Sequence, residues 1–311
     1  MRKYLQKLFC DCSAPLVHLW NDRWTTRQRQ WSQLEQRLEK LQISLGRVER
    51  RLSQNMDSSS LHDHEYQIFS QWGEDGILDY LVRSANIQNK TFVEFGVEDF
   101  TEANTRWLLM NQGWRGLVID GSAENIERIR KSAISWKYPL TAVSSFITVE
   151  NINELLLRHA PSRLLGILSI DVDGVDYWIW KAIHAVTADI VVVEYNSLFG
   201  PDEAVTIPYD SSFQRSKAHF SHSYYGASIA ALTQLGEEKG YACVGSNSAG
   251  NNAFFLRKDL LSSSLSALTA SQAYVRRGFR EARDPDGKLG LPSFEEEREL
   301  IKDLPLVRVG K

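Results

Sequence analysis

The sequence is poor in cysteine, and this scarcity restricts both its chemistry and its compartment. Three of the 311 residues are cysteines: Cys10, Cys12 and Cys243. Three thiols are too few for a disulfide framework, which is typical of a protein from a reducing compartment and predicts a cytoplasmic location. No second cysteine pair follows Cys10 and Cys12, so a structural zinc site is not expected.

The sequence also lacks long apolar runs and a surplus of charge of either sign. No stretch approaches the roughly 20 apolar residues that a membrane-spanning helix needs. With 36 Lys and Arg against 39 Asp and Glu, the net charge of −3 provides no general attraction for nucleic acid. Residues 1–16 are basic and amphipathic without a signal peptide's apolar core, so at most a weak contact with the inner membrane surface is expected.

Apolar residues recur at intervals of three and four between residues 17 and 53. They are Val17, Trp20, Trp24, Trp31, Leu34, Leu38, Leu41, Leu45, Val48 and Leu52. Polar residues fill most other positions, so the segment predicts an N-terminal coiled coil and self-association through it. The alternative is a single long helix that packs on its own domain. The serine-rich residues 54–64 are expected to form a linker.

Residues 91–120 are the centre of the predicted domain. An apolar run leads to Glu94 and Gly96, a helical pattern ends at Gly113, and a second apolar run ends in Asp120. Strand, helix and strand in this order are typical of the first half of a nucleotide-binding α/β sheet. The acid at the end of the second strand is placed to hold a ribose diol.

The turn that begins at Glu94 is acidic rather than glycine-rich. A dinucleotide fingerprint has three glycines that let the backbone approach a pyrophosphate, but residues 94–100 contain one glycine and three acids. Acids repel a pyrophosphate, whereas they attract a cationic ligand such as the sulfonium and ammonium groups of S-adenosylmethionine. The turn therefore favours that cofactor over a dinucleotide.

This stretch resembles the class I S-adenosylmethionine-dependent methyltransferases, whose first motif is an acid-x-glycine turn. A closer likeness to the FkbM-type methyltransferases comes from Asn104-Thr105-Arg106, Gly113-Trp114-Arg115-Gly116, Ile119-Asp120-Gly121 and the upstream SQWGEDG segment at residues 70–76. Glu98 and Phe100 stand where the usual motif has its second and third glycines. The resemblance implies S-adenosylmethionine as cofactor, bound by Gln71, Glu94, Gly96, Asn104, Asp120 and Gly121.

Strands and helices continue to alternate after Asp120. The predicted elements are strands at 140–143, 164–170 and 190–193, helices at 122–131, 151–159, 175–185 and 227–237, and late strands at 241–244 and 253–256. Residues 65–260 are therefore expected to form an α/β domain with a Rossmann-like class I methyltransferase sheet, mostly parallel with a late antiparallel strand. Residues 261–311 are expected to form a charged, partly helical extension.

Polar residues also stand at the ends of two later strands. Asp171 follows the strand at 164–170, and Glu194 and Asn196 follow the strand at 190–193. The carboxyl ends of parallel strands share one edge of the sheet, so these oxygen donors should lie close together. Such donors suit Mg²⁺, and the set is similar to that of the metal-dependent O-methyltransferases.

An ion at this edge would lower the pKa of a bound hydroxyl and orient it toward the methyl group. Asp171 is for this reason a candidate catalytic residue as well as a ligand; the alternative is that it caps the following helix. His219 and His222 lie in the long loop at 198–225, and either could accept the proton.

The sequence is therefore interpreted as an S-adenosylmethionine-dependent O-methyltransferase. FkbM-type enzymes commonly methylate sugar hydroxyls, which implies a sugar or glycan acceptor. Two alternatives remain open. Asp171-Val172-Asp173 also looks like the D-x-D of a glycosyltransferase, and a non-catalytic coiled-coil scaffold would account for the missing glycines.

Overall fold

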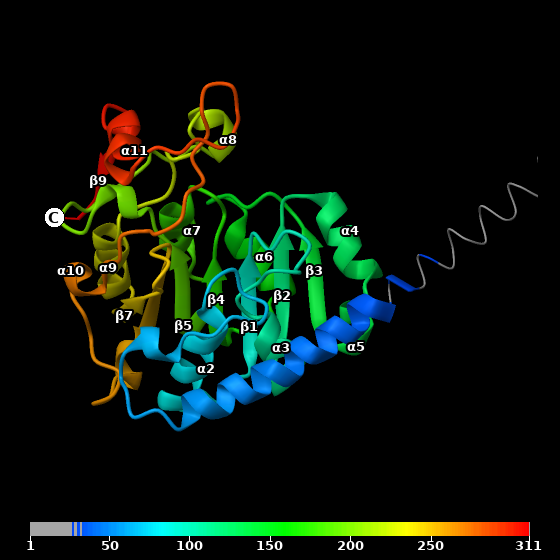
Figure 1. Ribbon diagram of the computed structural model, residues 1–311. Coiled ribbons are helices and arrows are strands. Elements are labelled where there is room, and N and C mark those ends of the chain that lie inside the picture. Colours follow the sequence, from blue (N-terminus) through cyan, green and yellow to red (C-terminus); the bar gives the residue numbers. More distant parts are fainter. Residues whose placement is uncertain (1–26, 28–29, 32, 311) are drawn as a thin grey trace, which may run out of the picture. The chain divides into compact units, whose positions relative to one another are not determined.

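The computed structural model describes residues 27, 30–31 and 33–310 (Figure 1). The chain divides into two compact units, with the boundary between Glu49 and Arg50. The basic segment 1–16 and the first heptads of the predicted coiled coil lie outside the described residues. Residues 33–54 are helical, as the heptad pattern predicts. The apolar seam positions in the described part are exposed: Trp31, Leu34, Leu38, Leu41, Leu45, Val48 and Leu52.

One seven-stranded sheet is present in the described part of the second unit. Its strands are β1 (Thr91–Phe95), β2 (Arg115–Asp120), β3 (Leu140–Ser144), β4 (Leu164–Ile170), β5 (Thr187–Glu194), β7 (Tyr241–Ser246) and β8 (Asn252–Arg257), in the order β3-β2-β1-β4-β5-β8-β7. The strands β1 to β5 are parallel to one another, and β8 is antiparallel to both β5 and β7. The predicted mostly parallel sheet with a late antiparallel strand is confirmed.

Helices separate most of these strands along the chain. They are α2 (Glu74–Ser84), α3 (Arg106–Gln112), α4 (Ala123–Lys131), α5 (Ala133–Lys137), α6 (Ile152–His159), α7 (Asp176–Ala182) and α9 (Ile229–Glu238). Their ends follow local sequence signals: Gly113 closes α3 with a φ of 72°, and the Ser122 side chain accepts a hydrogen bond from the backbone N–H of Asn125. No helix in the described residues is long and apolar enough to cross a membrane.

Part of the segment expected to be a linker is packed instead. Residues 61–64 form a short 3-10 helix, η1 (Leu61–His64), in which Leu61 and His64 are both buried. Nδ1 of His64 lies 2.9 Å from the Ser53 hydroxyl, and its ring stacks on Tyr80 at 3.8 Å. The serines before η1 indicated a solvated link, but the apolar and aromatic contacts of these two side chains fix the end of the segment to the domain.

The C-terminal residues are part of the second unit rather than an appendage to it. After η3 (Lys258–Leu260) come α10 (Ala270–Ala273), α11 (Phe294–Ile301) and β9 (Val307–Arg308), and β9 pairs with β6 (Val205–Thr206). Figure 1 shows α11 and α8 (Arg215–Ala218) together at one end of the sheet. The buried ion pair between Arg277 and Glu297 fastens α11 to the preceding segment. Residues 261–311 therefore contribute to the end of the sheet where β4 and β5 finish.

The SQWGEDG segment is held in place by its two acids. Oδ2 of the buried Asp75 accepts hydrogen bonds from the backbone N–H groups of residues 68, 69 and 70 at 2.7, 2.6 and 2.8 Å. Oε1 of Glu74 accepts from the side chains of Asn247 and Asn252 at 2.7 and 2.8 Å. These bonds join the start of α2 to β8, so both acids are structural and the loop that carries Gln71 is fixed beside the sheet.

Candidate functional site

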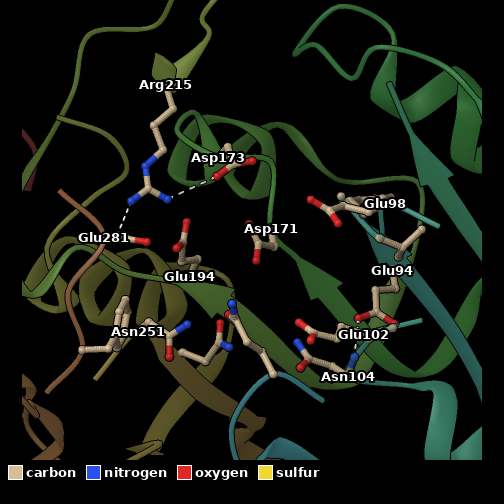
Figure 2. Close-up of a pocket in the computed structure, with 17 residues that line it drawn as sticks. Glu94, Glu98, Glu102, Asn104, Asp171, Asp173, Glu194, Arg215, Asn251 and Glu281 are labelled. Carbon is tan, nitrogen blue, oxygen red and sulfur yellow. Dashed lines mark hydrogen bonds and ion pairs between the residues drawn. The ribbon is translucent and has the colours of Figure 1, made fainter. Parts of the chain in front are cut away.

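A cavity of about 210 Å³ opens where the parallel strands β1, β4 and β5 end (Figure 2). Gly96 directly follows β1, Asp171 directly follows β4, and Glu194 is the last residue of β5. β8 runs in the opposite direction, so it begins at this edge, where Asn252 pairs with Glu194. The strand directions alone therefore bring these residues together.

The wall of this cavity is strongly acidic. Among the described residues that line it, Arg215 is the only Lys or Arg, and the carboxylates are Glu94, Glu98, Glu102, Asp171, Asp173, Glu194 and Glu281. Figure 2 shows several of these groups turned toward a common space. An excess of negative charge at the end of the sheet attracts cationic groups and repels phosphates.

Glu94 is the most thoroughly hydrogen-bonded of these acids. It is 4% exposed, and its two oxygens accept from the backbone N–H groups of Asn104 and Thr105 and from the Thr105 hydroxyl. Burial raises the pKa of Glu94 to about 7 although these bonds oppose the shift. The side chain therefore ties β1 to the start of α3 while it lines the cavity.

The turn after β1 has the left-handed backbone that glycines usually adopt, although two of its three residues in this conformation are not glycines. Gly96 has a φ of 66°, and a Cβ there would overlap the carbonyl oxygen of Asp171. Glu98 and Phe100, where the usual methyltransferase motif has glycines, also adopt positive φ values of 48° and 63°. Two residues with side chains thus accept a left-handed conformation that costs them free energy, which is common at binding sites.

The acid predicted to hold a ribose already has backbone partners. Asp120, at the end of β2, accepts from the N–H of Glu98 at 2.9 Å and from the N–H of Ser122 at 2.7 Å. Asp120 and Gly121 do not line the cavity, whereas Glu98 does. A carboxylate has about four lone-pair positions, so Asp120 can fix the turn and still accept from a ligand's hydroxyls.

The other predicted cofactor residues, Gln71 and Asn104, line the cavity. The backbone N–H of Asn104 bonds to Glu94, and its side chain donates to the Ser169 hydroxyl at 3.1 Å. Asn104 therefore connects β1 and β4, the two strands beside which a ligand in this cavity would lie. Four of the six predicted cofactor residues are brought together: Gln71, Glu94, Gly96 and Asn104.

Three carboxylates meet at the ends of β4 and β5. Asp171, Asp173 and Glu194 each place one oxygen within 4.8 Å of the others. Burial and neighbouring negative charge raise the pKa values of Asp171 and Glu194 well above their usual range. Oε2 of Glu194 is buried and has no hydrogen-bond partner among the described residues. A buried oxygen without a partner is costly, so this cluster suits a cation or a proton.

Asn196 does not belong to this cluster, although it was predicted as a metal ligand. Its amide NH₂ donates to the carbonyls of Ser223 and Tyr225 at 2.9 and 3.0 Å, and its Oδ1 accepts from the N–H of Leu198 at 3.1 Å. These three hydrogen bonds fix the loop after β5 and occupy the polar atoms of the Asn196 side chain. Asp173 is the third member of the cluster instead.

The alternative interpretation, in which Asp171 caps the following helix, is wrong, because the residue at the N-terminal cap of α7 is Val175. The turn before α7 is held by Asp176, whose carboxylate accepts from the N–H groups of Val172 and Gly174 at 2.8 and 2.9 Å. Asp171 lines the cavity instead. Its neighbour Asp173 has a positive φ of 57° and is exposed.

The two candidate histidines lie apart from the acidic cavity. Neither lines it; His222 lines a second cavity beside it, and Nδ1 of His219 is 2.8 Å from the Ser221 hydroxyl. Burial lowers the pKa of His219. The backbone carbonyl of His222, rather than its ring, accepts a hydrogen bond from Arg215 at 2.6 Å.

Arg215 and Glu281 line the cavity but have no counterpart in the sequence-based prediction. Arg215 forms ion pairs with Asp173 at 3.4 Å and with Glu281 (Figure 2). Its guanidinium also lies 3.7 Å from the ring centre of Tyr225. Arg215 stands in the loop at 198–225, whose length was its only sequence signal. Glu281 comes from the C-terminal residues, which showed none.

Comparisons with known proteins found similar solved structures only. No family model and no curated protein matches the sequence. Solved structures that resemble the chain include the N-terminal domain of EvdMO1 with SAH bound, with 12% identity, a TM-score of 0.40, and coverage of 60% of this chain and 80% of that one. An O-methyltransferase from Bacillus cereus in complex with SAH has 11% identity, a TM-score of 0.38, and coverage of 69% and 89%.

Likenesses at this level say nothing about activity, and the strand order is the firmer observation. A sheet of five parallel strands followed by an antiparallel pair, with acids at the ends of β1 and β2, is a Rossmann-like class I methyltransferase fold. The function of the site has to be argued from its own residues.

The raised pKa of Glu94 predicts a pH dependence of stability. A carboxyl group whose pKa rises on folding contributes stability that is complete below its unfolded value of 4.5 and is lost as the pH passes about 7. The free energy of unfolding should therefore fall between these pH values, with a share of up to about 3 kcal/mol from Glu94. Urea denaturation at several pH values should give a shallower fall for Glu94→Gln; equal slopes would contradict the assignment.

Proposed function

We propose that this protein is an enzyme that transfers the methyl group of S-adenosylmethionine to a hydroxyl of a sugar or glycan. The observation that carries the proposal is the acid-lined cavity at the carboxyl ends of β1, β4 and β5. In an open parallel sheet this edge is where ligands bind. An acidic wall suits a sulfonium cofactor, and the resemblance to FkbM-type enzymes supplies the class of acceptor.

The residues around the turn after β1 fit this cofactor. Glu98 and Glu102 add negative charge beside the cavity, where a ligand's ammonium or sulfonium group is stabilised. The carboxylate of Asp120 accepts a hydrogen bond from the backbone of this turn, and it keeps further lone pairs for ribose hydroxyls. The surroundings of Gly121, the residue after Asp120, are open: a Cβ added there would meet only Phe146, at 3.4 Å.

The cluster of Asp171, Asp173 and Glu194 fits a divalent cation such as Mg²⁺. All three offer carboxylate oxygens, the hard ligands that Mg²⁺ prefers, and the partnerless Oε2 of Glu194 gains a partner when a cation is bound. Such an ion supplies positive charge that lowers the pKa of a nearby hydroxyl. When no cation is bound, the raised pKa of Glu194 makes its carboxylate a stronger base than an ordinary glutamate, which suits it to take the proton of an acceptor hydroxyl.

A sugar-nucleotide transferase is the second candidate, and one observation favours it. Asp171 and Asp173 of the D-x-D sequence do lie in one cluster with Glu194. Against it stands the rest of the cavity wall, since Glu94, Glu98 and Glu102 would face the phosphates of the donor. The acidic turn therefore supports methyl transfer over glycosyl transfer.

The exposed seam of the N-terminal helix supports self-association as part of the same proposal. Apolar side chains at successive seam positions, from Trp31 to Leu52, are exposed in the single chain. A second helix that carries the same seam would bury them in a coiled coil. The enzyme is therefore proposed to act as an oligomer that is joined through this helix.

Calorimetric titration of the purified chain should show binding of S-adenosylmethionine and none of UDP-glucose. Asp120→Ala should weaken cofactor binding by about tenfold or more, because a hydrogen bond to a charged group contributes about 1.5–3 kcal/mol. Thermal unfolding of the variant without ligand separates loss of binding from loss of folding. Unchanged cofactor affinity in a folded Asp120→Ala variant would exclude the ribose role.

Metal binding should depend on the cluster and not on the acidity of the cavity in general. Asp171→Asn removes one ligand charge and should weaken Mn²⁺ binding, followed by electron paramagnetic resonance, by about tenfold or more. Glu102→Gln is the matched control, because Glu102 lines the cavity but lies outside the cluster. EDTA should stop methyl transfer and leave the cofactor bound; transfer that persists in EDTA would refute the metal's role.

Removal of residues 1–49 should leave a folded monomer. The cut is placed before Arg50 because Arg50 pairs with Asp79 at 2.8 Å and Ser53 bonds to His64, so both belong to the second unit. Light scattering should give an oligomer for the full chain and a monomer for the fragment. The same assembly in both proteins would argue against the coiled coil.

A further inference from the structure

A second cavity, of about 450 Å³, adjoins the acidic one. Asp173, Arg215 and Glu281 line both cavities, so these three side chains form the wall between them. A ligand in the second cavity therefore lies directly beside the carboxylate cluster. Its other walls include Phe146, Phe213 and Arg283, which play no part in the acidic cavity.

The charges of the second cavity are paired with one exception. The guanidinium of Arg215 is matched by Asp173 and Glu281, and Glu281 also binds Arg277 at 2.9 Å. Arg283, by contrast, has no side-chain hydrogen bond or ion pair among residues 27, 30–31 and 33–310. Among the described residues that line this cavity, Arg283 is therefore the charged side chain that a ligand would meet without an ion-pair partner.

The backbone of Arg283 is fixed although its side chain is not engaged. Its N–H donates to the carbonyl of Ser221 at 3.0 Å, and it forms an isolated antiparallel bridge with Leu289. A guanidinium on an anchored backbone, at the edge of a cavity, can offer two parallel N–H donors to a carboxylate or a phosphate. Loss of conformational entropy on binding is smaller there than for an arginine on a free loop.

Two aromatic side chains give the second cavity an apolar part of its wall. The ring of Phe213 lies directly on Gly174, where a Cβ would overlap it, so the ring is held close against the turn after β4. Phe146 also lines the cavity and is 48% exposed. Flat apolar faces beside polar groups suit the C–H face of a sugar ring.

The backbone at the cavity wall is strained in a way that supports a binding role. Asp173 and His222 both line the second cavity, and both adopt left-handed φ values, 57° and 58°. Such conformations are uncommon for residues other than glycine, and they concentrate at binding sites. The neighbouring contacts of Arg215 with both residues hold this arrangement.

We propose that the second cavity binds the acceptor, and that Arg283 recognises an anionic group on it. The acceptor is then an acidic sugar that carries a carboxylate or a phosphate, with its ring on Phe213 and a hydroxyl toward the cluster of Asp171, Asp173 and Glu194. That the occupant is the acceptor rests on the proposed function. The preference for an oxyanion rests on the cavity alone.

The test is a binding comparison with three probes on the full chain, with and without SAH. Methyl β-D-glucuronoside carries a carboxylate, α-D-glucose 1-phosphate carries a phosphate, and methyl β-D-glucoside carries neither. Ligand-detected NMR should give at least about tenfold tighter binding for one or both charged probes than for the neutral one. Whichever probe binds more tightly identifies the source of the negative charge.

Arg283→Gln should remove this preference while the affinity for SAH stays unchanged. Arg283→Lys should restore part of it, because a lysine keeps the charge and loses the fork of two donors. Arg280→Gln is the matched control, since Arg280 is exposed in the same segment and lines neither cavity. The control should bind all three probes as the wild type does.

The outcomes separate this inference from the proposed function. If SAH binds and the three probes bind equally, the anion site is wrong and methyl transfer stands. If the charged probes bind through Arg283 and SAH does not bind, the anion site stands and the methyltransferase proposal fails. A preference for charged probes that survives Arg283→Gln would overturn the role of Arg283.

Discussion

The site depends on one close approach, in which the backbone of Gly96 lies against the carbonyl of Asp171. A Cβ at Gly96 would overlap that oxygen, so only glycine lets the ends of β1 and β4 meet at this distance. The contact sets the relative position of the acidic turn after β1 and the cluster after β4. Residues of both segments line the acidic cavity.

The acids around that contact are stabilised in different ways, and the difference separates structure from function. Asp75, Glu74 and Glu94 are buried, and each accepts two or more hydrogen bonds from the protein. Asp75 also has one oxygen without a partner, but its other oxygen accepts four hydrogen bonds. Glu194 is buried too, and no hydrogen bond to its carboxylate is found among the described residues. Hydrogen bonds offset the cost of desolvating the first three acids. For Glu194 this cost is not offset by hydrogen bonds within the protein, so a bound cation or proton would stabilise it.

Segments far along the chain complete the site. The loop that carries Arg215 and the C-terminal segment that carries Glu281 meet in an ion pair above the cluster, and Arg277 joins Glu281 to Glu297 on α11. These charged contacts balance part of the negative wall, which would otherwise repel itself. They also divide the polar space at the end of the sheet into two cavities, one acidic and one with a free guanidinium.

The sequence by itself determined that the sheet is mostly parallel with a late antiparallel strand, and it determined which acids stand at the sheet's edge; the order of the strands came from the tertiary structure. Apolar runs that end in Glu94, Asp120, Asp171 and Glu194 suffice, because parallel strands present their carboxyl ends at one edge. Whether Asn196 or Asp173 faces the cavity was decided by loop hydrogen bonds. Arg215 also required the tertiary structure: it meets Asp173 and Glu281 across 42 and 66 residues, and contacts at such separations leave no periodic trace in a sequence.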